Sequence, residues 1–203
     1  MLQLFIKGGP IMWPLLATSL VALTVVLERV FFILRERLRR DPAVVEKIFA
    51  SVENGDPERA ITIGQGSKDF VARVLTFALS HREQSHTNAL LRGAGRELKR
   101  FNRGLSLLDT VITLAPLLGL LGTVTGMIRS FSLLGGEELG APAAITGGIA
   151  EALIATAFGL LIAIIALLPF NFLNTKLEDA RHEIEDAAAR LDALLKPADS
   201  FGK

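Results

Sequence analysis

The chain has no cysteine and carries a net charge of only +1. The absence of cysteine excludes disulfides, thiol chemistry and thiolate metal sites. The charge balance gives no indication of nucleic-acid binding. The sequence also has no nucleophile–base pair, metal-ligand spacing or phosphate-binding loop. We therefore expect no enzyme activity, no cofactor and no metal.

Apolar residues are abundant. Half of the 203 residues are hydrophobic and the mean hydropathy is +0.44, which is typical of a helical membrane protein with a modest soluble part. Charged residues are almost absent from three segments, and each segment is long enough to cross a bilayer as a helix. The sequence therefore predicts an all-α membrane protein with three transmembrane helices and cytoplasmic helical extensions.

Basic residues set the predicted orientation. Residues 34–106 hold 14 of the 22 lysines and arginines and the tail after Phe172 holds five, whereas the N-terminal stub has only Lys7. The positive-inside rule places the two basic regions in the cytoplasm. The predicted parts are an outer stub (1–10), a first span (11–33), a cytoplasmic helical region (34–104), a second span (105–131), an outer loop (132–142), a third span (143–172) and a cytoplasmic C-terminal helix (173–203).

The cytoplasmic region is predicted to be helical. Asp41-Pro42 and Asp56-Pro57 are helix-start signals, and Asn54-Gly55 marks a turn between them. Apolar residues recur at helical spacing from Phe70 onward. We expect a solvated helical stalk that extends the membrane helices. The tail, expected to continue the third span, has an apolar face that predicts packing against a partner, formed by Leu177, Ala180, Ile184, Ala188, Leu191 and Leu195.

Glu151 stands out in the third span. It lies near the start of an apolar stretch in which no other ionisable residue occurs before Lys176. A charge inside a span costs about 3 kcal/mol on insertion scales, so such a residue usually faces a bundle interior or a water-filled path. Ion or proton handling is the hypothesis that this position favours.

The second and third spans each have a face of small residues. On a helical wheel of about 100° per residue, the small face of the third span lies beside Glu151 and includes Thr156, while bulky residues occupy the opposite side. The second span has a similar face that includes Thr123. Small residues at this spacing indicate either close helix packing or the lining of a narrow lumen. The small residues are Ala115, Gly119, Gly122 and Gly126 in the second span and Ala152, Ala155, Gly159 and Ala163 in the third.

Four other ionisable residues give weaker evidence of a functional role. Asp109 lies at the inner end of the second span, where we expect a water-exposed acid at a helix end; a role at an inner proton exit is the alternative. His81, His86 and His182 lie outside the spans and are expected at the surface.

Two segments resemble a known family. LAPLLGLLGTVTGMIRSF (114–131) and GGIAEALIATAFGLLIAI (147–164) are similar to the signature helices of the MotA/TolQ/ExbB proton channel family. The ExbB/TolQ branch is the closer one, since GGPIMWPLL (8–16) and the GDPERA and ARVLTFAL patterns (55–79) also resemble it. A flagellar MotA-type stator fits less well, because it resembles the chain only in the last two spans.

The resemblance implies a homopentamer in the bacterial inner membrane, with the N-terminus in the periplasm and the C-terminus in the cytoplasm. It implies that the ring surrounds a dimer of a single-span ExbD/TolR-like partner and uses the proton motive force to do mechanical work. A TonB-like or TolA-like protein is a further partner that it allows. By resemblance, Glu151, Thr156 and Thr123 lie in the lumen, and the main proton-carrying aspartate lies on the partner.

Two alternatives stay open at the level of sequence. One is a non-conducting membrane scaffold, which needs the packing faces but no acid. The other is a self-sufficient cation channel with Glu151 as a selectivity ring. The sequence does not identify the client pathway. Siderophore uptake and envelope maintenance are among the candidates.

Overall fold

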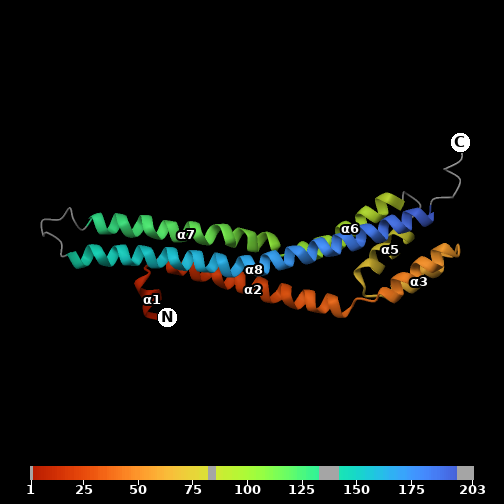
Figure 1. Cartoon of the computed structure of the whole chain (residues 1–203), viewed down its shortest axis with the longest axis horizontal. Helices are drawn as coiled ribbons and strands as arrows, with labels where there is room; N and C mark the ends of the chain where they lie inside the picture. The colour runs from red at the N-terminus through yellow and green to blue at the C-terminus, as the bar shows by residue number, and fades with distance from the viewer. Residues whose placement is uncertain (1, 82–85, 133–141, 196–203) are drawn as a thin grey trace. The chain divides into compact units, whose positions relative to one another are not determined.

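A computed structural model of the chain describes residues 2–81, 86–132 and 142–195 (Figure 1). Within these ranges the chain is helical and contains no strand, which confirms the predicted all-α class. The helices are α1 (Leu2–Lys7), α2 (Met12–Leu38), α3 (Pro42–Glu53), α4 (Pro57–Gln65), α5 (Phe70–Ser80), α6 (His86–Asn102), α7 (Leu105–Ser132) and α8 (Pro142–Leu195).

The chain divides into two compact units, which we describe separately. The first comprises the described residues of Met1–Arg29 and Gly104–Leu173, and the second those of Val30–Arg103 and Asn174–Lys203. Helices α2 and α8 contribute to both units. Helix α8 is continuous through the predicted third span and most of the tail, as its 54 residues form one helix.

The first unit contains the apolar helices, and we call it the membrane unit. Three helical stretches in the described chain are long and apolar enough to cross a membrane. They correspond to α2, to α7 together with most of α6 before it, and to α8. Most of each apolar stretch is exposed in the single chain. The buried contact near the start of α2 joins Met12 and Leu15 to Ala115 of α7. The large exposed apolar surface is therefore available to lipid or to other subunits.

The second unit has a hydrophobic core, unlike the solvated stalk expected from the sequence. Helices α3, α4 and α5 pack against one another, and α5 packs against α6. Ile48 and Leu75 are fully buried. The stalk prediction was wrong for this segment because the apolar faces of several short helices cover one another. Asp41 and Asp56 cap α3 and α4, as their Asp-Pro sequences predicted.

The apolar face of the C-terminal helix is used within the chain. Leu177, Ala180, Ile184 and Leu191 are buried, and Ala187 is buried in place of Ala188, which the predicted face had included. In the second unit, Arg190 of α8 donates two hydrogen bonds to Glu46 of α3 and stacks on Phe49. These bonds lower the pKa of Glu46 and raise that of Arg190. The partner-facing surface predicted for the tail thus packs largely against its own subunit.

Candidate functional site

The small residues of α7 and α8 bring these two antiparallel helices into close contact (Figure 1). A Cβ atom added to Gly159 would lie 2.5 Å from the backbone oxygen of Ala115, and one added to Gly119 would lie 3.0 Å from Cα of Thr156. Farther along, a Cβ on Gly126 would lie 2.9 Å from Cβ of Ala152. Glycine is needed here because backbone approaches backbone.

The predicted small faces therefore meet within one chain. Gly122 also belongs to this contact, since an added Cβ would lie 2.5 Å from Cβ of Ala155. Ala163 is also buried, on the same helix as Ala155, α8. These atoms face a neighbouring helix, so a polar lumen formed by several copies would have to be lined by other side chains of α7 and α8.

The two threonines predicted in the lumen bond differently. Thr156 Oγ1 of α8 donates to the carbonyl of Gly119 of α7 at 2.8 Å. Thr123 Oγ1 donates to Leu120 of its own helix at 2.6 Å. A carbonyl of the same helix is the usual acceptor for a threonine hydroxyl, whereas the Thr156 bond joins two helices. Thr156 therefore contributes directly to the α7–α8 contact.

This difference leads to a prediction about stability. Thr156→Val removes the bond between the helices, so we expect a loss of about 1 kcal/mol in the free energy of unfolding. Thr123→Val removes only a bond within α7 and serves as the matched control, with a smaller expected effect. Unfolding in mixed detergent micelles measures both, and equal effects would contradict the assignment of the interhelical bond.

Glu151 lies where three elements meet. Its carboxylate Oε1 accepts a hydrogen bond from Nη1 of Arg129, near the end of α7, at 2.9 Å. The turn between α1 and α2 covers the same carboxylate, because a Cβ on Gly9 would lie only 1.8 Å from Oε1. Gly9 has a φ of 72°, a conformation that glycine adopts without strain. The Glu151 side chain is consequently only 23% exposed.

Arg129 is the residue of this site that the sequence did not identify as a partner of Glu151. In the sequence it stands only as a charge at the edge of the predicted outer loop. The signal that could have found it is the register of the two small faces, in which Gly126 opposes Ala152. Arg129 lies three residues beyond Gly126 on α7, and in this register it is within one helical turn of Glu151.

The structure does not bring Asp109 to this site. Asp109 is exposed in the second turn of α7. It precedes Arg129 by 20 residues of the same helix, or about 30 Å at 1.5 Å per residue. Asp109, for which a role at an inner exit was the alternative, is thus separated from Glu151 by the length of the span.

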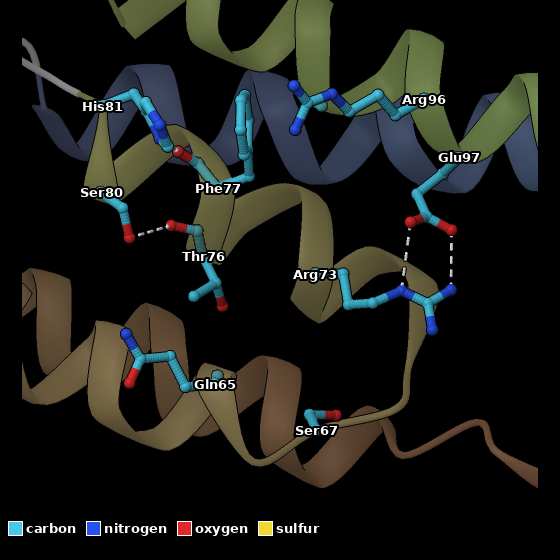
Figure 2. Close-up of a pocket in the computed structure, with 11 residues that line it drawn as sticks. Gln65, Ser67, Arg73, Thr76, Phe77, Ser80, His81, Arg96 and Glu97 are labelled. Carbon is cyan, nitrogen blue, oxygen red and sulfur yellow. Dashed lines mark hydrogen bonds and ion pairs between the residues drawn. The ribbon is translucent and has the colours of Figure 1, made fainter.

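The second unit contains a pocket of about 390 Å³ between α4, α5 and α6 (Figure 2). Arg73, which lines this pocket, donates two hydrogen bonds to Glu97 and a third to Glu36. His81 lies at this pocket, exposed and stacked on Phe77. His182 is also exposed, whereas the side chain of His86 lies outside the part that the structure describes. These groups belong to the packing of the second unit rather than to the Glu151 site.

Comparison with known proteins gives consistent matches. The model of the MotA/TolQ/ExbB proton channel family matches residues 64–186. The putative biopolymer transport protein ExbB-like 1 of Synechocystis sp. is 42% identical over 180 residues, which cover 85% of this chain and 70% of that protein.

More distant relatives have similar names. The putative biopolymer transport protein ExbB homolog of Methanothermobacter thermautotrophicus is 31% identical over 188 residues, covering 91% of this chain and 66% of that protein. The biopolymer transport protein ExbB of Neisseria gonorrhoeae is 38% identical over 104 residues, covering 51% and 47%. With three apolar helices, these similarities imply an inner-membrane protein of the transport and channel type. The chain belongs to the MotA/TolQ/ExbB proton channel family, among the ExbB-like biopolymer transport proteins.

Proposed function

We propose that this chain is the channel subunit of an ExbB–ExbD-like or TolQ–TolR-like inner-membrane complex that converts the proton motive force into mechanical work for biopolymer transport or envelope maintenance. The observation that carries this proposal is the position of Glu151. It is the acid of the apolar stretch of α8 that precedes Lys176, and its partly buried carboxylate lies at the junction of α7, α8 and the Gly9 turn. An ionisable group held in this way within a span favours ion or proton handling.

The orientation follows from the distribution of basic residues. The second unit, which holds most of the arginines and lysines, lies in the cytoplasm, while the N-terminus and the α7–α8 connection lie in the periplasm. Glu151, near the N-terminal end of α8, is then in the outer half of the membrane. Asp109 is exposed at the inner end of α7, where a role at an inner proton exit is the alternative to a water-exposed acid at a helix end.

The assembly proposed is a homopentamer around a dimeric single-span partner. Its support is the family, together with the apolar surface that α2, α7 and α8 leave exposed in one chain. Part of this surface contacts lipid, part contacts neighbouring copies, and part faces the partner helices. A TonB-like or TolA-like protein would receive the mechanical work.

In the proposed mechanism, Glu151 supplies an acidic group of the outer proton path to the partner helices. A carboxyl on the partner takes up a proton on the outer side and releases it toward the cytoplasm. Thr123 and Thr156 lie near this path, but their hydroxyl protons are used in bonds to Leu120 and Gly119. Their oxygen lone pairs remain able to accept a hydrogen bond from a protonated carboxyl.

Proton flux in proteoliposomes tests this function. The chain is reconstituted alone and with its single-span partner, under an imposed potential and pH gradient. Partner-dependent flux is expected, and Glu151→Gln is expected to lower it about a hundredfold, the lower end of what a positioned proton-transfer group contributes. Glu178→Gln is the matched control, because Glu178 lies on the same helix but in the second unit, next to Arg181.

The two alternatives give different results in the same experiment. A scaffold would show no flux with or without the partner, although the complex assembles. A self-sufficient channel would show full flux from the chain alone. Partner-dependent flux that Glu151→Gln leaves at the wild-type level would remove Glu151 from the mechanism.

A further inference from the structure

The Arg129–Glu151 pair places opposite charges at the same level of the membrane unit. Between Thr110 and Ile128, α7 has no ionisable residue, and α8 has none between Glu151 and Lys176. The two side chains are joined at 2.9 Å. Within the described residues of α7 and α8, Arg129 is the cation that balances Glu151 at this depth.

The charge balance affects which ions a ring of this chain would attract. A ring of carboxylates lining a pore is a common basis of cation selectivity. A cleft lined by charges of one sign raises the local concentration of counter-ions about tenfold or more. A ring in which each carboxylate is paired with a guanidinium has no net charge at that level and lacks this attraction.

The surroundings of the pair favour its persistence. The Gly9 turn covers Oε1 of Glu151, and the neighbouring Gly8 lies against Ile154, since an added Cβ would be 3.2 Å from Cγ2 of that residue. The Arg129 side chain, in contrast, is 54% exposed. The carboxylate is held on one side by backbone and on the other by a cation that is about half exposed in the single chain.

We propose that Arg129 is the resident counter-ion of Glu151 and keeps the channel from conducting metal cations when no partner helix is engaged. This inference rests on the proposed channel function and adds a specificity-determining residue to it. Arg129 acts by cancelling the charge of Glu151, and it does not itself carry the proton. A partner helix would gain access to Glu151 by displacing the exposed guanidinium.

Potassium leak through the full-length chain reconstituted without a partner tests this role. Arg129→Gln is expected to raise the leak on the order of tenfold over wild type. Adding Glu151→Gln to that variant should return the leak to the wild-type level, because the uncompensated acid is then gone. Arg129→Lys should stay near wild type, since it keeps the charge. Lys7→Gln is the matched control, as Lys7 is an exposed cation in the membrane unit outside this pair.

The outcomes separate this inference from the function on which it rests. A leak that Arg129→Gln does not raise, or a raised leak that persists in the double variant, overturns the counter-ion role. An equal rise with Lys7→Gln also overturns it, because the effect would then follow general charge. Partner-dependent proton flux through the wild-type complex is a separate readout and tests the proposed function whatever the potassium leak shows.

Discussion

Replacing Gly159 with alanine is expected to destabilise the membrane unit by about 3 kcal/mol, the upper end of the usual cost of overpacking. The added methyl group would lie 2.5 Å from the backbone oxygen of Ala115 and 3.0 Å from Cα of Gly119. Backbone atoms cannot move aside as a flexible side chain can, so α7 and α8 would have to separate. The separation would also lengthen the bond from Thr156 to Gly119.

Gly147→Ala is the matched control for this prediction. Gly147 lies on the same helix, but no atom is within 4 Å of its added Cβ. Because alanine favours helix over glycine by up to about 1 kcal/mol, this variant should be neutral or slightly more stable. Unfolding of the full chain in mixed micelles measures both. Similar effects of the two substitutions would show that helix propensity, and not the α7–α8 contact, controls the result.

The α7–α8 contact was largely predictable because the residues that form it recur at regular intervals in the sequence. Small residues recur at helical spacing in both spans, and a wheel places them on one face without knowledge of the partner helix. The partner of Glu151 was not predictable in this way. Pairing Glu151 with Arg129 requires the relative register of two helices and the path of the Gly9 turn, which are properties of the packed chain.

In the second unit, too, features set by neighbouring residues in the sequence could be predicted, whereas features set by contacts between distant residues could not. The Asp-Pro starts of α3 and α4 were found because proline and the capping acid are adjacent in the sequence. Asp69, which begins α5, has no proline after it. Its role depends on Arg40 and Asp41, which precede it by 29 and 28 residues. The stalk prediction failed for a related reason, since short amphipathic helices show whether they cover one another only after folding.

Asp69 is the residue of the second unit whose replacement we expect to cause the largest loss of stability. Its carboxylate is buried and accepts four hydrogen bonds. Oδ1 accepts from the backbone nitrogens of Val71 and Ala72 at 2.8 and 3.1 Å. Oδ2 accepts from the backbone nitrogen of Asp41 at 2.8 Å and from Nη1 of Arg40 at 2.7 Å. One side chain therefore caps α5 and fixes the connection between α2 and α3.

Asp69→Ala is expected to reduce the stability of the second unit by about 4 kcal/mol, because it removes the buried member of a partly buried ion pair and leaves buried backbone donors without an acceptor. Arg40 keeps its contact with Glu183, which is why we expect less than the full penalty of an isolated buried charge. Hydrogen exchange of the α5 amides in the intact, detergent-solubilised chain measures this loss as the free energy of local opening.

Two further variants separate the capping role of Asp69 from its role in the connection. Asp69→Asn retains one oxygen to accept from Val71 and Ala72 but presents an amide donor to Asp41 and Arg40, so its cost should be intermediate. Asp56→Ala removes an exposed cap that accepts only from the backbone of Arg59, at about 1 kcal/mol. If Asp69→Ala costs no more than Asp56→Ala, Asp69 acts as an ordinary helix cap, and the link from α5 to the α2–α3 connection contributes nothing to the stability of the second unit.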